Sequence, residues 1–268
     1  MAITTLDGAL AGMQYPREIV KAATGTLVSG RPHTLWYLAG MPGAGVASTA
    51  GITGEILASP VSGQIPFTNP SSGNSYLARF AGQATQPGQL LLCDKIWVNS
   101  GIVITQTTEQ TFTDSVQIPA RDSNGTTTGT GVMAAVEVSS AVGAGTPTLT
   151  LKYLNTAGQT KTATNVVSTV ASSIAGTFYP IGLSAGDTGI QKAVSLTLST
   201  TWTSGTIHVV LYRIIARLEL TSANTANAID SLTGGFPRIF DDSVLFPVFI
   251  PQTTSTSCIT GHVIVTQG

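Results

Sequence analysis

The segment Thr148–Leu154 reads Thr-Leu-Thr-Leu-Lys-Tyr-Leu, and it indicates the fold class more clearly than any other part of the sequence. Apolar and polar residues alternate strictly, which is the pattern of a β-strand with one buried and one exposed face. The following residues, Asn155–Gly158, are turn-forming types that end the strand. The polar positions are mostly threonine, which is β-branched and fits a pleated surface, yet meets water without a charge.

Similar short runs separated by turn clusters recur after about residue 76. They predict strands at Tyr76–Phe80, Leu90–Val98, Thr111–Ile118, Val132–Ser139, Thr148–Leu154, Thr160–Ser168, Phe178–Leu183, Ala193–Ser199, Thr206–Leu220, Val244–Ile250 and Gly261–Thr266. Many short strands with a single good helix predict an all-β fold. We expect an antiparallel β-sandwich of two sheets, of jelly-roll or related Greek-key type.

The N-terminal residues predict the one helix. Leu6, Leu10 and Met13 recur at helical spacing behind Thr5, whose hydroxyl makes a good N-cap. Pro16 bounds this short helix, because proline is not tolerated inside a helix.

The stretch from residue 25 to residue 75 is dense in glycine, proline and other turn formers, with little periodic pattern. It predicts an extended arm that wraps either its own body or a neighbour. We therefore divide the chain into a helix and arm over residues 1–75 and a β-sandwich domain over residues 76–268. Contacts with partners are also expected in two longer loops, Ala120–Gly131 and Thr221–Phe240.

The composition is unusual for a soluble domain. The 268 residues include 41 Thr, 24 Ser and 29 Gly, but only 25 charged side chains. At 9% charged, against about a quarter in typical domains, and with a mean hydropathy of +0.29, the chain has little of the charge that keeps monomers soluble. This composition predicts a protein whose working state is an assembly.

The charge balance also narrows the partners. The net charge of −1 gives no basic field of the kind that follows a nucleic-acid backbone, so we expect no direct nucleic-acid binding. The most apolar stretch, Ile207–Leu220, is interrupted by two arginines and a glutamate, so we expect no membrane span. Met1–Thr5 lacks the basic and apolar regions of a signal peptide, which predicts that the protein stays in the cytoplasm where it is made.

Few residues carry candidate chemistry. Cys93 and Cys258 fit no metal spacing, and we expect both to be reduced and buried. His33, His208 and His262 have no second histidine or carboxylate at ligand spacing, and His208 is expected at an outward polar position of its strand. No G-x-S-x-G motif occurs. We therefore expect no enzyme activity, no catalytic or metal-binding residues and no cofactor.

Two polar motifs have competing interpretations. Arg121-Asp122-Ser123-Asn124-Gly125 resembles half of a calcium loop, but it lacks the terminal glutamate of such a loop and is fully explained as a turn. Asp241 and Asp242 form a carboxylate pair, for which a solvated loop tip is favoured over an acid and base pair.

Aromatic side chains cluster in the arm and just after it. Such side chains anchor interfaces when they fill a pocket on a neighbour. The candidate interface residues are Trp36, Tyr37, Phe67, Tyr76 and Phe80. The alternative, which the sequence leaves equally open, is that they pack on the sandwich of their own chain.

Several motifs together resemble a family of structural proteins from tailed-bacteriophage virions. They are Leu6–Gly12, Leu35-Trp36 with Gly40–Gly45, Ile65–Pro70, Tyr76–Phe80, Ile118–Asp122 with Gly125, and Leu151–Asn155 with Gly158. The resemblance implies a capsid decoration or cement protein with a jelly-roll-like fold. It further implies a homotrimer on the outside of the head, bound to the major capsid protein or other virion proteins, in a virion assembled in the host cytoplasm.

Three other functions remain open at this level. Within the same class, the chain could be a tail or baseplate subunit. It could also be a glycan-binding receptor module, with Trp97, Trp202 and Tyr212 as candidates for stacking on sugars, or a hydrolase, which the sequence supports least.

Overall fold

A computed structural model of the chain describes residues 3, 5–113, 116–235 and 237–268. About 42% of the chain is strand and 4% is helix, and the strands form antiparallel sheets in a sandwich-like arrangement. The prediction of an all-β antiparallel sandwich with a short N-terminal helix is therefore confirmed. Over the described residues the strands form three sheets, which we call A, B and C, where the sequence suggested two.

Sheet A is built from strands that come from the beginning, the middle and the end of the sequence. In spatial order it contains β14 (Asn227–Asp230), β5 (Ser75–Ala84), β17 (Ile259–Gln267), β1 (Arg17–Lys21) and β3 (Gly40–Met41), with β15 (Arg238–Ile239) also paired to β5. Two short helices accompany it, α1 (Leu6–Ala11) and α2 (Ser231–Gly234). Strands from both ends of the sequence thus lie side by side in this sheet.

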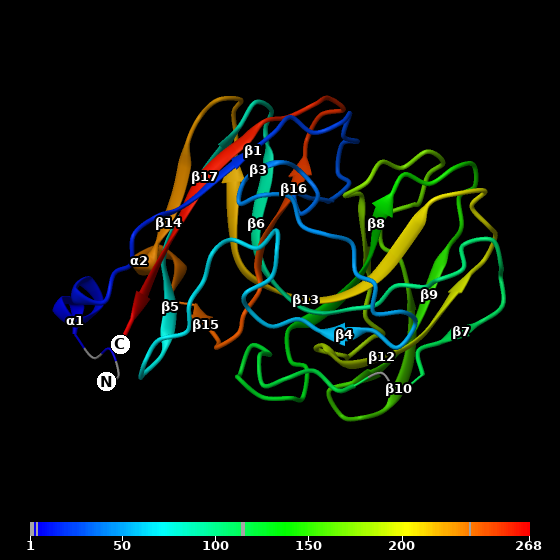
Figure 1. Cartoon of the computed structure of the whole chain (residues 1–268), viewed down its shortest axis with the longest axis horizontal. Coiled ribbons are helices and arrows are strands. Elements are labelled where there is room, and N and C mark those ends of the chain that lie inside the picture. The colour runs from blue at the N-terminus through cyan, green and yellow to red at the C-terminus, as the bar shows by residue number, and fades with distance from the viewer. Residues whose placement is uncertain (1–2, 4, 114–115, 236) are drawn as a thin grey trace.

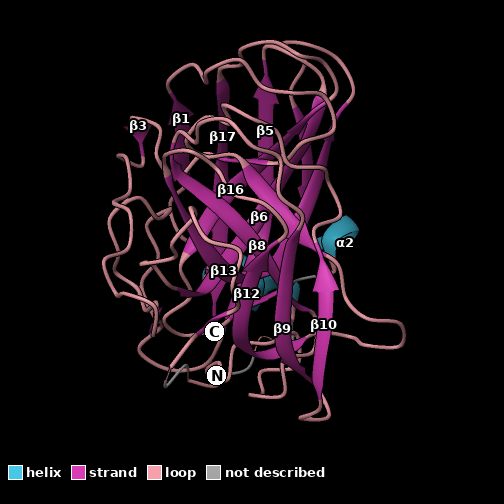
Figure 2. Cartoon of the chain, turned by 90° about the vertical axis from the view of Figure 1, so that its right-hand side faces the viewer, coloured by secondary structure: helices cyan, strands magenta, loops and turns pink. Residues whose placement is uncertain are grey.

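Sheet B is central, and sheet C packs against one part of it. Sheet B contains β11 (Phe178–Ile181), β8 (Val132–Ser140), β13 (Thr206–Leu220), β6 (Gly88–Val98), β16 (Leu245–Pro251) and β2 (His33–Thr34), with β4 (Glu55–Ile56) on β6. Sheet C contains β10 (Thr160–Thr164), β9 (Leu149–Asn155), β12 (Ile190–Leu198) and β7 (Gln110–Thr111). Figure 2 views the molecule from the sheet C side, with β9, β10 and β12 near the viewer.

The 15-residue strand β13 belongs to two hydrophobic cores. Ile207 and Leu211 pack in the core shared with sheet C, whereas Leu218 and Leu220 pack in the core shared with sheet A. Register shifts at residues 211/212 and 214/216 change which positions face inward. Odd-numbered residues up to Leu211 therefore face the first core, and even-numbered residues from Ala216 onward face the second, on the same face of sheet B. Figure 1 shows β13 crossing from the sheet C half to the sheet A half.

The N-terminal arm covers the opposite face of sheet B. Trp36 and Leu57 of the arm pack with Leu91, Phe178 and Phe246 of the sheet. The Trp36 and Phe246 rings meet edge to face with their centroids 6.2 Å apart. Of the two alternatives for the arm, this region therefore wraps its own body.

Most of the expected strands are present, and the bounds of β13 coincide with those expected. Thr111–Ile118 is the exception, because only residues 110 and 111 pair, at the edge of sheet C, and residues 114–115 lie outside the described part of the chain. The sequence pattern did not predict β1, β14 and β15, nor the two-residue strands β2, β3 and β4 of the arm. β1, β14 and β15 have five residues or fewer and pair with long strands that are distant in sequence.

The N-terminal helix is present with the expected cap. The Thr5 hydroxyl accepts a hydrogen bond from the Gly8 amide at 3.1 Å. The helix buries Ala9, while Leu6 and Leu10 face solvent. Its apolar stripe is therefore not the surface that attaches it to the body.

We predict that Leu92→Ala lowers the free energy of unfolding by about 2–5 kcal/mol, because Leu92 is fully buried between sheets A and B and its truncation leaves a cavity. Equilibrium urea denaturation measures the change. Val166→Ala, at a side chain that is 70% exposed, is the control and should change stability by less than about 0.5 kcal/mol. Equal effects of the two substitutions would contradict the assignment of this core.

Candidate functional site

A buried carboxylate lies between the two cores of sheet B. Asp94 is fully buried, and one oxygen accepts hydrogen bonds from Arg121 at 3.1 Å and from the Val244 amide at 2.9 Å. Its other oxygen accepts a hydrogen bond from the Ser243 hydroxyl at 2.8 Å and lies 3.9 Å from Arg213. Both arginines are also buried. This cluster therefore holds its charges away from solvent.

Arg121 joins four segments of the chain at this point. Its guanidinium donates to the backbone carbonyl oxygens of Leu57 at 2.7 Å, of Lys95 at 3.1 Å and of Asp242. The arm, β6 and the loop before β16 are thus attached to the loop that carries Arg121. Charge-assisted hydrogen bonds of this kind are among the stronger ones in proteins, so we interpret Arg121 as a structural residue.

A second buried ion pair lies on the arm side of sheet B. Lys95 and Glu137 are 2.8 Å apart, and the Tyr37 hydroxyl donates to the same glutamate oxygen at 3.0 Å. The Lys95 ammonium lies 4.4 Å from the centre of the Trp36 ring and 5.7 Å from that of Phe246. Burial and the neighbouring carboxylate raise the pKa of Tyr37, which keeps its hydroxyl protonated.

Because these clusters are buried, they reduce the number of charged side chains on the surface, and the sequence contains few charged residues in total. Of the 25 charged residues, Asp114 lies outside the described part of the chain and seven are buried, which leaves 17 for the remaining surface. The buried residues are Lys21, Asp94, Lys95, Arg121, Asp122, Glu137 and Arg213. The surface thus carries fewer charged side chains than the composition alone indicates.

Three of the five candidate interface aromatics are inside the molecule. Trp36, Phe67 and Phe80 are buried in the chain's own cores, and Tyr37 and Tyr76 are partly buried. For Trp36, Phe67 and Phe80, packing within the chain is the alternative that the structure supports. The three aromatics considered for sugar stacking, Trp97, Trp202 and Tyr212, are also buried and have no exposed ring face to offer.

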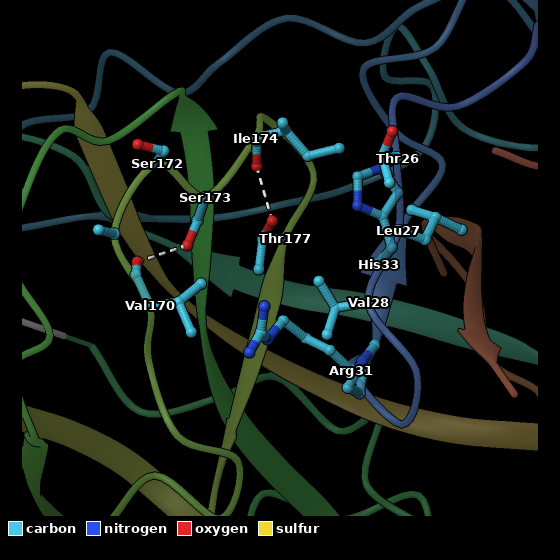
Figure 3. Close-up of a pocket in the computed structure, with 12 residues that line it drawn as sticks. Thr26, Leu27, Val28, Arg31, His33, Val170, Ser172, Ser173, Ile174 and Thr177 are labelled. Atoms are coloured by element: carbon cyan, nitrogen blue, oxygen red, sulfur yellow. Dashed lines mark hydrogen bonds between the residues drawn. The ribbon is translucent and has the colours of Figure 1, made fainter. Parts of the chain in front are cut away.

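The histidines and cysteines differ from expectation at two positions. His208 is buried, not outward, because β13 lies inside sheet B with both faces covered; its ring Nδ1 is hydrogen bonded to the Asn99 carbonyl. Cys93 and Cys258 are both free, but Cys258 is exposed, since it lies in the turn before β17. His33 is buried beside a surface cavity (Figure 3).

The Asp122 loop is a turn closed around its own carboxylate. Asp122 accepts hydrogen bonds from the amides of Asn124 and Thr126 and from the hydroxyls of Thr126 and Thr128. Burial opposes ionisation, but these hydrogen bonds outweigh it and lower the pKa of Asp122. The turn interpretation is confirmed, because the carboxylate oxygens are already occupied by donors of the loop.

Asp241 and Asp242 lie exposed in a loop, as the loop-tip interpretation predicted. Asp242 is attached to the neighbouring loop, since the Asn69 side-chain amide donates to its carboxylate at 2.8 Å. The pair therefore has a structural explanation.

One end of the molecule is made of turns that contain no charged residue apart from Arg31, which closes the turn at Val28. They are the segments 22–31, 84–88, 139–148, 165–177, 199–205, 221–226 and 251–258. These turns lie together along the upper edge of Figure 1. Hydrogen bonds connect them, such as the Thr24 amide to the Ser257 carbonyl and the Gly143 amide to the Ser204 carbonyl, both at 2.9 Å. We call this surface the uncharged end.

A separate apolar patch lies at the N-terminus. Leu6, Leu10, Met13 and Tyr15 are exposed by 66, 53, 43 and 85%. The backbone around them is fixed to β17, since the Gln14 amide donates to the Val265 carbonyl at 2.8 Å. The N-terminal patch is therefore held in place while its side chains remain uncovered, a combination typical of interaction surfaces.

The comparisons with known proteins give little further information. No protein-family model matches the chain, and no curated protein matches it. Solved structures of infectious bursal disease virus show faint similarity. One, of the Gt strain, is 9% identical over 95% of this chain and 82% of that chain, with a TM-score of 0.17. Another, of the VP2 subviral particle, is 10% identical over 96% and 82%, with a TM-score of 0.16. TM-scores this low do not establish a shared fold.

Two further structural findings bear on function. No helix in the described part of the chain is long and apolar enough to cross a membrane. Among the same residues, no group of three or more His, Cys, Asp or Glu side chains is placed to hold a metal ion.

We predict that Asp94→Asn lowers the free energy of unfolding by about 3–5 kcal/mol, because it leaves Arg121 and Arg213 buried without their carboxylate. Chemical denaturation of the purified proteins measures the loss. Asp241→Asn, in an exposed loop, is the matched control and should stay within about 0.5 kcal/mol of the wild type. If Asp94→Asn were as mild as the control, the cluster would not be a structural centre.

His33 should make stability fall between pH 6.5 and pH 4. Burial lowers the pKa of His33 to about 4. Between about pH 6.5 and pH 4 the His33 ring is therefore protonated in the unfolded chain but neutral in the folded chain, which favours unfolding. The full effect is about 3 kcal/mol. His33→Gln should remove this part of the pH dependence, whereas His262→Gln should retain it. Urea denaturation at pH 7 and pH 4.5 tests this, and parallel losses in wild type and His33→Gln would contradict it.

Proposed function

We propose that this chain is a structural subunit of a bacteriophage virion, a head decoration or cement protein that binds the outside of the capsid as a homotrimer and stabilises it. In this proposal the chain has no catalytic role, cofactor or metal. Its partners are copies of itself and the major capsid protein, and it assembles into the virion in the host cytoplasm.

The distribution of charge is the observation that carries the proposal. Seven charged side chains are buried, and in the turns of the uncharged end the one charged residue is Arg31, which lines a cavity there. In a closed symmetric oligomer, residues near the symmetry axis face their own copies, so that any charge there meets a like charge. A surface of threonine, serine, glycine and alanine avoids this repulsion. The uncharged end is therefore the surface we assign to contacts between copies.

The N-terminal patch is the surface we assign to the capsid. Its four apolar side chains project from a backbone segment that is fixed to β17. An exposed set of this kind suits burial in a groove of a partner, as amphipathic helix segments do in other complexes. The arm expected to clamp neighbouring subunits is largely engaged with its own sheet B, so the segment before it takes that role.

A tail or baseplate location is the second candidate within the same class, since a neutral surface would serve subunit contacts there equally well. Electron microscopy of virions carrying a labelled antibody against the chain distinguishes the two locations. Label on the head supports the decoration role, whereas label confined to the tail would replace it with the second candidate.

We predict that Thr146→Lys with Ser204→Lys, at two exposed positions of the uncharged end, weakens self-association at least tenfold, because each copy then brings like charges to the contact. Multi-angle light scattering measures the oligomer. Thr162→Lys, exposed on β10 next to Lys161, is the control and should leave it unchanged.

The second part of this test uses capsids. Wild type should sediment with the cognate capsids, and Leu6→Asp with Leu10→Asp should stay in the supernatant while remaining oligomeric. A wild-type protein that is monomeric and does not sediment with capsids would refute the proposal.

A further inference from the structure

A cavity of about 120 Å³ opens in the uncharged end, between the two halves of the molecule. One wall comes from the segment before β2, residues 26–33, and the other from the segment before β11, residues 170–177. Figure 3 shows the two walls facing each other. The rim residues Thr26, Val28, Ala171 and Ser172 are exposed, and the deeper residues Leu27, His33, Ser173 and Thr177 are buried.

Arg31 brings a positive charge into this cavity. Its Nε is buried without a hydrogen-bond partner, and its Nη2 makes only a long hydrogen bond of 3.4 Å to the Ser168 carbonyl. The guanidinium carbon lies 5.8 Å from the centre of the Tyr179 ring. A buried donor without an acceptor costs about 1–3 kcal/mol. A ligand that supplies a hydrogen-bond acceptor to the Arg31 guanidinium would therefore be bound favourably.

His33 adds a second polar group to the cavity. The ring is 2% exposed, lines the cavity and makes no hydrogen bond within the described part of the chain. Desolvation lowers its pKa to about 4, so at neutral pH the ring offers one N–H donor and one acceptor.

The remaining lining defines the chemistry of the ligand. The hydroxyls of Ser173 and Thr177 donate to the carbonyls of Val170 and Ile174, each at 2.8 Å, so they have no further proton to give. No acidic side chain lines the cavity, and Leu27, Val28 and Val170 make parts of its wall apolar. The volume equals that of about four water molecules. A small anion with a short apolar part fits these features.

We propose that this cavity binds a carboxylate group carried on a short aliphatic stem. The carboxylate accepts hydrogen bonds from the Arg31 guanidinium and from the His33 N–H, and the stem lies against the apolar wall. Two sources have this chemistry: a free short-chain carboxylate, or the side chain of an aspartate or glutamate presented by another protein.

The experiment follows the ring signals of the three histidines by NMR while propionate is added to the full-length protein. We expect the His33 signals to shift with a dissociation constant of about 1–10 mM, as suits a ligand of five heavy atoms. The His208 and His262 signals should stay in place and report that the fold is intact. Propionamide, which has the same shape without the charge, should bind at least tenfold more weakly.

Two variants test the assignment of the residues. Arg31→Gln should weaken propionate binding at least tenfold, whereas Arg217→Gln, at an exposed arginine of β13, should not change it. Val28→Glu places a carboxylate at the rim and should block the cavity while retaining Arg31. If Arg31→Gln does not fold, Val28→Glu still tests the site, because it should abolish propionate binding.

A blocked glutamate, N-acetylglutamic acid amide, distinguishes the two sources. Binding of both propionate and the blocked glutamate supports the site and indicates an acidic side chain as a fitting ligand, whereas binding of propionate alone supports it and indicates a free carboxylate. Absence of a His33 shift with either compound, or equal binding of propionamide, would overturn the proposal.

Discussion

A single strand has to complete two hydrophobic cores, and most of the architecture follows from this constraint. β13 pairs with β8 over residues 206–213 and with β6 over residues 210–220. An uninterrupted alternation would present one row of side chains to a single flat layer. The register shifts within β13 instead let one strand pack against sheet C and then against sheet A, and sheet B becomes the layer that both halves share.

The point where the two cores meet is also where the charges are buried. Asp94 lies between Leu92 of one core and Ile96 of the other, and Lys95 faces the arm. Replacing such ion clusters with apolar residues is often neutral for stability, so we infer that this cluster serves to specify which segments meet. Here Arg121 connects its loop with the arm, β6 and the loop before β16. The charges thus define an arrangement that alternating threonine and leucine alone would leave ambiguous.

Elements that depend on neighbouring residues could be predicted from the sequence. Features that depend on contacts between residues far apart in the sequence could not. β13 was predicted with its observed bounds because its apolar run is long, and the cap at Thr5 needs only three neighbouring residues. The division into three sheets depends on register shifts between paired strands. These shifts cannot be predicted from the alternation of apolar and polar residues within one strand. The pairing of Lys95 with Glu137 joins residues 42 positions apart. The partner of the candidate interface aromatics could not be predicted for the same reason. An arm that covers its own sheet needs the same aromatic side chains as an arm that covers a neighbouring subunit.

Sheet A also determines when this protein can complete its folding. Its β1 pairs with β3 on one side and with β17 on the other, so the second side of residues 17–21 is paired only when residues 259–267 are present. On a ribosome that adds about 5–20 residues per second, the sheet C half is synthesised before β17, the strand that lies between β1 and β5. β1 and β5 therefore join into one sheet only after residues 259–267 have been made, and sheet A is among the last parts of the described chain to be completed.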